Sequence, residues 1–408
     1  MSESLVVQKY GGSSLSSPLH IKRVAEKIAA RARADVRIIV TVSAMGSTTD
    51  RLVGLAQEVA PSPSRRELDM LLSVGERISM ALLSMALNSI GCRAISFTGS
   101  QSGIVTSVGH TRALIEEIRA GRIEDAIAGG HVVIVAGFQG VSRAKEITTL
   151  GRGGSDTTAV ALAARFGAAS CEIYSDVAGV FTADPRIVPR ARRIPRISYD
   201  EMLELSARGA KVLHYRAAEL ARRYGVPLRL LSTFDEGGGT VVEKGIAMEH
   251  ESVASVTSQK NMSLIRIDTA GDGSVLADFV RRSVEADVRL ASYQRFSEGR
   301  ADRISIVVDQ DNVSGARAIL EALAAPASAW SVEDGLSSVT IVGYGLSCGV
   351  RSLDRLERVL VSEGIPVRFI STSSLSITCL VPADLGEKTV SVLHEALIDS
   401  EKVRPGPL

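Results

Sequence analysis

Two glycine-rich segments, far apart in the chain, carry charged and hydroxyl side chains of the kind that bind phosphate. The first is Lys9-Tyr10-Gly11-Gly12-Ser13-Ser14, directly after an apolar run. Its glycines let backbone N–H groups approach an anion, and Lys9 supplies a positive charge. Because Lys9 precedes the glycines, this is not the GxxxxGK[ST] loop of P-loop nucleotide hydrolases. Alone, the segment fits a phosphate cradle and a plain strand-to-loop turn equally well.

The second segment, Gly151-Arg152-Gly153-Gly154-Ser155-Asp156, leads straight into the helical pattern TTAVALAA. Ser155 or Asp156 is expected to cap this helix, whose first N–H groups would then face an anion. Arg152 offers a guanidinium fork that matches a carboxylate or a phosphate. Asp156 has a second candidate role, which is to position a lysine ammonium. Two such loops, each after a strand, indicate a ligand at the carboxyl edge of an open α/β sheet.

Three further segments carry polar groups. The stretch from Ile173 to Arg186 follows a strand and suits a base, a ribose and phosphates, with Phe181 either a stacking surface or ordinary core packing. The stretch from Ser43 to Thr49 places hydroxyls at a strand end, where they suit a small polar substrate. Glu76 lies in a helical run, and a lone glutamate there is usually a solvated surface charge. The six histidines form neither a metal cluster nor a triad.

The composition excludes several classes of protein. The 408 residues suggest two or three domains, and 45% hydrophobic with 23% charged residues is ordinary globular usage. A net charge of +1 lacks the excess of basic residues that nucleic-acid-binding proteins use to neutralise phosphates, so this class is disfavoured. The longest apolar runs are far shorter than the ~20 residues that span a bilayer, and no secretory signal is visible. Four scattered cysteines without a CxxC pair disfavour a zinc site or disulfides, so we expect a cytoplasmic protein with no membrane segment.

Up to about residue 245, short apolar runs alternate with helical patterns. This alternation predicts an α/β fold with a mostly parallel sheet and helices on both faces. The expected strands are 5–8, 36–42, 94–97, 132–136, 171–174 and 228–231. The expected helices are 21–32, 50–59, 67–90, 156–166 and 211–224.

The remainder of the chain repeats the order strand, helix, strand, strand, helix, first over 264–323 and then over 338–397. This order predicts tandem ferredoxin-like (βαββαβ) sandwiches, with two unrelated small domains as the alternative. Each unit lacks one strand, and the unassigned run Val253–Ser258 would complete the second by interlacing. The expected domains are therefore 1–245, 263–337 and 338–408, the last completed by 253–258.

Together these residues point to phosphoryl transfer, in which positioning and charge neutralisation do most of the catalysis. The ordered motifs VQKYGGSSL, TVSAMGSTTD, LLSVGERIS, SFTGSQSGI, TTLGRGGSDTTAVALAA, YSDVAGVFTADPRIVP and SARGAKVLH resemble those of the aspartokinases, within the amino-acid-kinase superfamily. The resemblance covers nearly the whole chain. It implies a three-layer α/β/α amino-acid-kinase domain with a mostly parallel central sheet, followed by two ACT domains.

The resemblance also implies that ATP, with Mg²⁺ carried on its phosphates, phosphorylates the β-carboxylate of L-aspartate. The product, 4-phospho-L-aspartate, would lead toward lysine, threonine, methionine and related aspartate-semialdehyde products. Lys9 and Lys211 would contact phosphate as catalytic residues, and Asp156 would organise them. The family more often has tyrosine at Phe181. The other implied ATP-binding residues are Gly11, Gly12, Ser175, Asp176, Phe181, Asp184 and Arg186, and the implied aspartate-binding residues are Ser43, Thr49, Glu76, Arg152, Gly153, Gly154 and Ser155.

The ACT region departs from the family pattern. The turns 268–273 and 343–350 lack the usual proline, and 288–296 lacks the usual Asn/Asp/Gln pattern. The resemblance therefore implies a homo-oligomer through the ACT domains in which feedback by lysine and threonine is weakened or altered. Met248 is either a linker methionine or the start of a separate short chain, as in related aspartokinases. The candidate effector-binding residues in the ACT region are Asp268, Gly273, Gln294, Ser371 and Thr372.

Three alternatives stay open. A related kinase that uses glutamate, N-acetylglutamate, carbamate or a nucleotide would share the fold, although the GRGGSD loop and the ACT pair favour aspartate. A catalytically silent amino-acid sensor would rely on the ACT pair alone, although intact Lys9, Asp156 and Lys211 argue against it. An isoenzyme dedicated to one pathway and relieved of feedback would explain the ACT departures.

Overall fold

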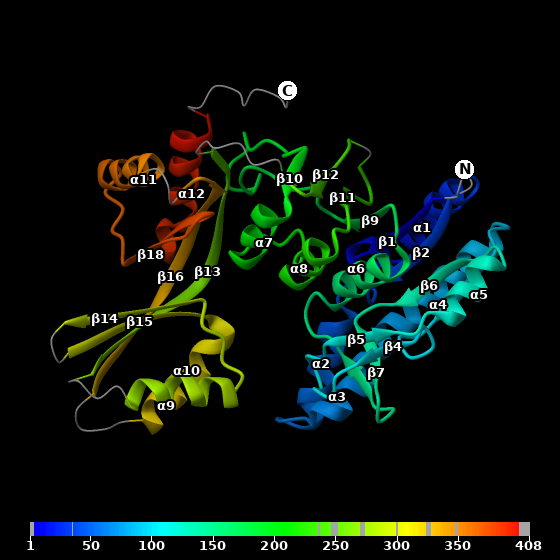
Figure 1. Cartoon of the computed structure of the whole chain (residues 1–408), viewed down its shortest axis with the longest axis horizontal. Helices are drawn as coiled ribbons and strands as arrows, with labels where there is room; N and C mark the ends of the chain where they lie inside the picture. The colour runs from blue at the N-terminus through cyan, green and yellow to red at the C-terminus, as the bar shows by residue number, and fades with distance from the viewer. Residues whose placement is uncertain are drawn as a thin grey trace. The chain divides into compact units, whose positions relative to one another are not determined.

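The computed structural model describes residues 4–34, 36–235, 237–245, 252–269, 274–298, 301–323, 328–346 and 350–399. The chain forms two compact units (Figure 1). The first contains residues 1–181 and 192–248, and the second contains residues 182–191 and 249–408. Two residues of interest, Met248 and Gly273, lie outside the described residues.

An eight-stranded sheet forms the centre of the first unit, in the order β10-β12-β11-β9-β1-β2-β6-β3. All neighbouring strands are parallel except β11 and β12, so the predicted mostly parallel sheet is confirmed. The middle strands are buried on both faces, which explains their continuous apolar sequences. The strands are β1 (Leu5–Tyr10), β2 (Arg37–Val42), β3 (Ala94–Phe97), β6 (Val132–Ala136), β9 (Ser170–Ser175), β10 (Arg196–Ser198), β11 (Leu228–Ser232) and β12 (Thr240–Glu243).

Helices cover both faces of this sheet. On one face, Tyr10, Val40 and Ile134 pack in a common core with α1 (Pro18–Ala32) and α4 (Val74–Ser89). On the other face, α6 (Gly154–Phe166) contacts β1, β2 and β9 and lies beside α8 (Tyr215–Tyr224) (Figure 1). The remaining helices of this unit are α2 (Thr48–Val59), α3 (Arg65–Leu72), α5 (Gly121–Ala128) and α7 (Tyr199–Ala207).

Two predicted helices differ from the structure. The predicted helix 67–90 is interrupted at Ser73, whose carbonyl accepts a hydrogen bond from the Gln139 side chain at 2.8 Å, and α3 and α4 lie on either side of it. The predicted helix 211–224 begins only at Tyr215, because the His214 side chain caps it by accepting from the Arg216 N–H. Lys211 therefore lies in a turn before this helix.

A second, four-stranded sheet in the first unit was not predicted. Its order is β5-β4-β7-β8, and each strand has only three or four residues, which is too short for a hydrophobic period to be visible. This sheet matters because the GRGGSD loop follows its last strand. The strands are β4 (Ile104–Thr106), β5 (Ile115–Ile118), β7 (Gln139–Ser142) and β8 (Ile147–Thr149).

One stretch, Arg65–Ser89, is long and apolar enough to cross a membrane by length and composition alone. It consists of α3 and α4, and in α4 the side chains of Met80, Leu83 and Leu87 pack in the core against the central sheet. We therefore assign it to the interior of the folded domain.

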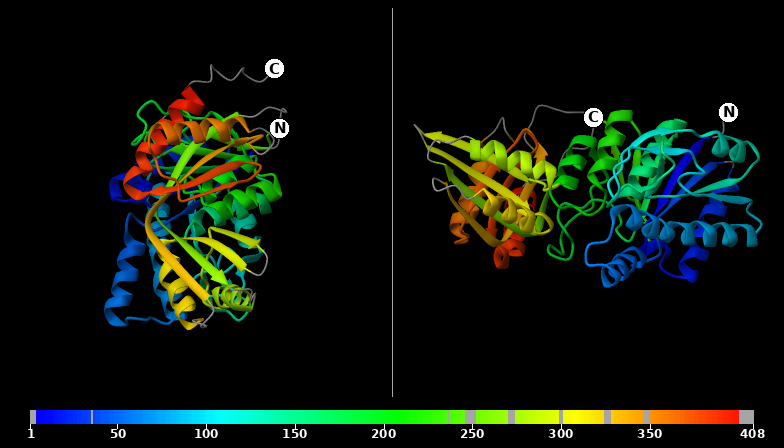
Figure 2. Two further views of the ribbon diagram at one scale, coloured as in Figure 1. Left: turned by 90° about the vertical axis from the view of Figure 1, so that its left-hand side faces the viewer. Right: turned by 90° about the horizontal axis from the view of Figure 1, so that it is seen from below.

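A single six-stranded sheet, in the order β14-β15-β13-β16-β18-β17, forms the second unit. Its two central strands, β13 (Ser252–Thr269) and β16 (Ser328–Tyr344), are long and antiparallel, and they run through the whole unit in Figures 1 and 2. The other strands are β14 (Ser292–Glu298), β15 (Ala301–Asp309), β17 (Phe369–Thr372) and β18 (Ser376–Pro382). The helices are α9 (Ser274–Glu285), α10 (Gln310–Ala322), α11 (Arg351–Ser362) and α12 (Gly386–His394), the last followed by a π-helical turn over Glu395–Asp399.

The run Val253–Ser258 is the first half of β13. It pairs with the second half of β16, which also pairs with β18, whereas the second half of β13 pairs with β15. The separately considered runs 253–258 and 264–267 are thus one strand, with irregular pairing around Asn261, whose φ is 60°. Two cores flank this strand: α9 and α10 pack with one half of the sheet, and α11 and α12 with the other. The predicted ferredoxin-like pair therefore shares its central strands.

Candidate active site

Lys9 and Asp156 form an ion pair at the carboxyl edge of the central sheet. Because side chains alternate along β1, Lys9 points to the opposite face from Tyr10, toward α6. Asp156 lies in the first turn of α6, where the helix dipole favours a negative charge. The distance from Lys9 Nζ to Asp156 Oδ1 is 2.7 Å, and both side chains are mostly buried. Asp156 occupies one of the three donors of the ammonium, so the others remain for a ligand.

The first glycine-rich segment packs tightly on the segment that follows β2. The Gly12 carbonyl accepts from the Gly46 N–H at 3.0 Å, and a Cβ on Gly12 would lie 2.8 Å from the carbonyl oxygen of Ala44. The Ser43 N–H donates to the Tyr10 carbonyl at 3.1 Å. Glycine is therefore required at Gly12 by a close approach of two backbones. The predicted phosphate and substrate segments are brought together here.

Glu76 is buried, contrary to the expectation for a lone helical glutamate. It lies in the first turn of α4 and is only 3% exposed. Gly75 makes this position possible, because a Cβ there would lie 2.7 Å from Ala44 Cβ. Glu76 Oε1 accepts from the Ala44 N–H at 3.0 Å, whereas Oε2 is buried and has no hydrogen-bond partner among the described residues. Burial raises the pKa of this carboxyl to about 7.

The prediction that Ser155 or Asp156 caps α6 is wrong. The N-cap is Gly153, with a left-handed φ of 73°, and no side chain caps the helix. The Gly153 carbonyl instead accepts from the Thr157 N–H and hydroxyl. Ser155 is buried against Gly137, which follows β6.

The GRGGSD loop contacts the segment that contains Lys211. A Cβ on Gly153 would lie only 2.0 Å from the Cγ of His214, and the His214 N–H donates to Asp156 Oδ2 at 3.4 Å. Lys211 precedes His214 by three residues. Lys211 and Arg152 are exposed, and neither forms an ion pair with another residue in the described ranges.

The predicted nucleotide residues fall into two groups. Asp176, after β9, accepts from the Ser13 hydroxyl at 3.5 Å, which joins it to the first glycine-rich segment. Ser175 instead accepts from the Val177 N–H, and half-buried Phe181 pairs through its backbone with Arg193. Thr49 lies half-buried in α2.

Asp184 and Arg186 belong to the second unit, in the segment 182–191. Their side chains form an ion pair of 2.6 Å, and the hydrogen bond from Arg186 lowers the pKa of Asp184. Ala183 and Val188 anchor the same segment in the core of that unit, and the Thr182 hydroxyl lies 2.8 Å from His394 Nε2.

The candidate effector residues are spread across the six-stranded sheet. Gln294 lies on the edge strand β14 opposite Ser305, and Ser371 and Thr372 lie on the opposite edge strand, β17. Asp268, on β13, is 3.6 Å from the Arg303 guanidinium. Both side chains of this ion pair are more than half exposed.

Two residues that were not predicted, Arg216 and Asp69, support the GRGGSD loop on the side of α3 and α8. Arg216 donates to the carbonyls of Leu150 and Ala113, at 2.5 Å and 3.1 Å, and fully buried Asp69 accepts from Thr149. An arginine or aspartate within a helix carries no local signal for such a role. Only the three-dimensional arrangement identifies it.

Comparisons with known proteins identify the family. A model of the amino acid kinase family matches residues 4–232, and an ACT-domain model matches residues 339–397. The aspartokinase of Mycolicibacterium smegmatis is 44% identical over 96% of each chain. The aspartokinase of Geobacillus stearothermophilus is 40% identical, over 96% of this chain and 97% of its own. The chain belongs to the aspartokinases.

Solved aspartokinase structures agree with this membership. E. coli aspartokinase III in complex with aspartate and ADP, in the R-state, has a TM-score of 0.84 at 26% identity, covering 96% of this chain and 99% of that one. The same enzyme in complex with lysine and aspartate, in the T-state, has a TM-score of 0.75 and covers 97% and 99%. The predicted aspartokinase fold and enzyme class are thereby confirmed.

Proposed function

We propose that this aspartokinase transfers the γ-phosphoryl group of ATP to the β-carboxylate of L-aspartate, giving 4-phospho-L-aspartate and ADP. The choice of acceptor rests on the buried carboxylate of Glu76, whose Oε2 has no hydrogen-bond partner among the described residues. A buried carboxylate needs a cation or donors to remain charged, and the ammonium of an α-amino acid supplies both. N-acetylglutamate and carbamate lack that ammonium and would leave Glu76 unpaired. This contrast favours an amino acid with a free amino group.

The cations around the GRGGSD loop favour the transfer step, because the negatively charged carboxylate of aspartate must approach the negatively charged γ-phosphate of ATP. In the proposal, a carboxylate oxygen of aspartate attacks the γ-phosphorus, and the bond to the bridging oxygen breaks as ADP leaves. Lys9, held by Asp156, neutralises charge on the transferring group, and Lys211 contacts the phosphates. Arg152, with Gly153, Gly154 and Ser155, binds the aspartate carboxylates, aided by Ser43 and Thr49. Mg²⁺ would be held by the phosphates of ATP and would neutralise them.

The nucleotide would bind beside the first glycine-rich segment. Gly11 lies beside Lys9, where an added Cβ would be 3.4 Å from the Lys9 Nζ, and Gly11 and Gly12 would contact the phosphates through their backbone. The Ser13–Asp176 contact joins that segment to Ser175 and Asp176. Phe181 offers a stacking surface without the hydroxyl of the usual tyrosine. Asp184 and Arg186 remain proposed ATP-binding residues on the family resemblance alone.

Regulation and assembly form a separate part of the proposal. The proposed domains are a catalytic domain of residues 1–245 and ACT domains of residues 263–337 and 338–408, the second completed by 253–258. The shared strands β13 and β16 support this interlacing. We expect a cytoplasmic homo-oligomer that associates through the ACT domains, with Asp268, Gly273, Gln294, Ser371 and Thr372 as effector candidates. Its product would feed lysine, threonine, methionine and related pathways, or one dedicated pathway.

A panel of acceptors tests the reaction. ADP release would be measured with L-aspartate, glutamate, N-acetylglutamate, carbamate and a nucleotide, and acyl phosphate would be trapped with hydroxylamine. Turnover and hydroxamate with aspartate alone are expected. Preferential turnover of another acceptor would replace the proposed substrate, and absence of turnover with every acceptor would favour the amino-acid sensor.

A further inference from the structure

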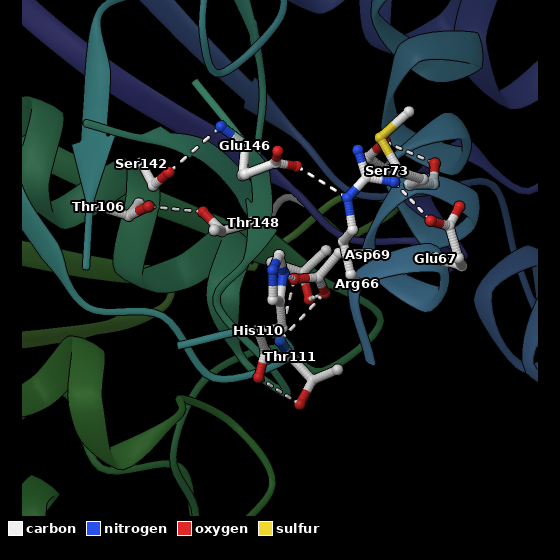
Figure 3. A network of polar contacts seen from close by, with 12 residues as sticks. Arg66, Glu67, Asp69, Ser73, Thr106, His110, Thr111, Ser142, Glu146 and Thr148 are labelled. Carbon is white, nitrogen blue, oxygen red and sulfur yellow. Dashed lines mark hydrogen bonds and ion pairs between the residues drawn. The ribbon is translucent and has the colours of Figure 1, made fainter. Parts of the chain in front are cut away.

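A fully buried aspartate, Asp69, lies behind the GRGGSD loop and is not part of the proposed substrate contacts. It is on α3, and its side chain faces the hairpin between β4 and β5 and the end of β8 (Figure 3). A buried carboxylate is costly unless it is fully hydrogen-bonded, so its partners show what it holds in place.

Asp69 joins two backbone segments that are distant in sequence. Its Oδ1 accepts from the Thr149 hydroxyl at 2.5 Å, and both carboxylate oxygens lie within hydrogen-bond distance of the Thr111 N–H, at 3.1 Å and 3.0 Å. The His110 Nδ1 lies 2.8 Å from Oδ2. The same two segments are joined directly, because the Ala113 N–H donates to the Thr149 carbonyl at 2.9 Å. One side chain therefore fixes the end of β8 and the hairpin together.

The hairpin in turn supports the first residue of the GRGGSD loop. Thr111 has a left-handed φ of 67°, which is strained for a β-branched residue and persists only where its surroundings enforce it. This conformation directs the Thr111 carbonyl toward Gly151, where an added Cβ would lie 2.9 Å from that oxygen. Thr149 is the residue before Leu150, whose carbonyl Arg216 holds. The loop is thus fixed at its entry from two sides.

We propose that Asp69 is a positioning residue for aspartate. Through Thr149 and Thr111 it orders the loop that carries Arg152 and Ser155 before the substrate binds. A loop that is already ordered loses little conformational entropy when the substrate binds, so its order increases the affinity for the substrate. This inference rests on the proposed function of the loop in binding aspartate.

Thr149 and Thr148 provide a matched pair for the test. Both are buried in β8, but Thr148 points to the other face and bonds to Thr106 at 2.5 Å instead of to Asp69 (Figure 3). Thr149→Val removes a hydrogen bond to a charged acceptor, so KM for aspartate should rise about tenfold. KM for ATP should change by less than about twofold, because Lys9, Gly11 and Gly12 are on another segment. Thr149→Ser, which keeps the hydroxyl, should restore the wild-type KM, and Thr148→Val should leave both KM values unchanged.

A second variant and a second measurement keep the test decisive if Thr149→Val folds poorly. Asp69→Asn preserves the shape of the side chain but removes one acceptor, and it should raise KM for aspartate in the same selective way. Hydrogen exchange of the peptide that covers residues 150–155 should be faster in Thr149→Val than in Thr148→Val, without substrate present.

Three outcomes have distinct meanings. Equal KM values for aspartate and equal exchange in Thr149→Val and Thr148→Val would overturn the role of Asp69. Parallel increases of KM for aspartate and for ATP would also overturn it, because they indicate a general loss of structure. A wild-type enzyme without aspartate-dependent ADP release would instead refute the proposed function itself.

Discussion

The ammonium of Lys9 and the carboxylate of Asp156 lie 2.7 Å apart, although β1 and α6, which carry them, are far apart in the sequence. The backbone of Lys9 is fixed by β1 and that of Asp156 by the start of α6, and the ion pair between them orients the ammonium. The pair is mostly buried, and a ligand phosphate that reaches it would meet a cation already oriented. Electrostatic catalysis depends on such orientation in advance.

Replacing Lys9 should abolish turnover while the protein stays folded. Lys9→Met removes the cation at the transferring group, and kcat should fall by about 10³-fold or more. It also leaves Asp156 without its partner, so the unfolding free energy should fall by about 2 kcal/mol, and Lys9→Met/Asp156→Asn should recover part of that loss. ADP release and denaturant unfolding are the measurements. Lys27→Met is the control, because it also removes a lysine ammonium, but one that lies over the Tyr174 ring, 4.6 Å from its centroid, and is not a proposed phosphate ligand. Unchanged acyl-phosphate formation in Lys9→Met would contradict the mechanism.

The stability of the ligand-free protein should fall as pH rises from about 4.5 to about 7. Glu76 has its pKa raised to about 7 by burial, so across this range the folded state holds a proton that the unfolded state has lost. Unfolding therefore releases a proton in this pH range, so the free energy of unfolding decreases as pH rises, and the total decrease reached by about pH 7 is about 3 kcal/mol. Glu76→Gln should remove this dependence and be more stable than wild type at pH 8. Denaturant titrations at pH 5 and pH 8 measure it, and parallel curves for the two proteins would count against it.

Aspartate binding should require the same carboxyl in its ionised form. Below the pKa of about 7, a growing fraction of Glu76 is protonated and does not attract an ammonium. KM for aspartate should therefore rise by about tenfold per pH unit below 7, with little change in KM for ATP. In Glu76→Gln, KM for aspartate should be raised by about 100-fold at pH 8 and lose this dependence. A Glu76→Gln enzyme with wild-type KM would exclude Glu76 from the substrate site.

Two glycine-to-alanine changes should have opposite effects. In Gly12→Ala the new Cβ would lie 2.8 Å from the Ala44 carbonyl oxygen, so the two segments must separate, at a cost of about 1–3 kcal/mol and with loss of activity. Gly54→Ala, in α2, meets nothing within 4 Å and should stabilise the protein by about 0.5–1 kcal/mol. Thermal unfolding and ADP release compare them. Full activity in Gly12→Ala would show that the close contact is dispensable.

Feedback inhibition by lysine and threonine should be weak or altered. The turns 268–273 and 343–350 lack the family's proline, and Asp268 is already engaged by Arg303. Activity of the purified enzyme should be largely retained with sub-millimolar lysine plus threonine. Strong inhibition at those concentrations would show that the ACT sites still bind both effectors.

Expression from the natural gene should show whether Met248 starts a second chain. Internal initiation would produce a short polypeptide beginning at Met248, and Met248→Leu should remove it without altering the full-length product. A single full-length band from the unaltered gene would indicate that Met248 is an ordinary linker residue.

The sequence predicted the central sheet well, because parallel strands buried on both faces leave continuous apolar runs. The predicted bounds of β3 and β6 equal those observed. The four-stranded sheet was missed because its strands are too short to show a period. The start of α8 was misplaced because His214, an infrequent capping residue, sets it.

The site was only partly predictable for a different reason. Lys9 and Asp156 stand out because each adjoins a glycine-rich segment, and the structure brings them together. The burial of Glu76 depends on how closely Gly75 approaches Ala44, which no spacing along the chain encodes. Asp69 gave no signal, because its partners Thr111 and Thr149 are 42 and 80 residues away.

The continuous course of β13 and β16 limits how this protein can be divided. Each strand contributes hydrogen bonds to both halves of the regulatory sheet. A gene fragment that ends at residue 337 would remove the far end of β16, and a fragment that begins at residue 338 would lose β13 altogether. Either fragment would expose long unpaired strand edges, which favour aggregation. We therefore expect the two regulatory modules to fold only as one cooperative unit.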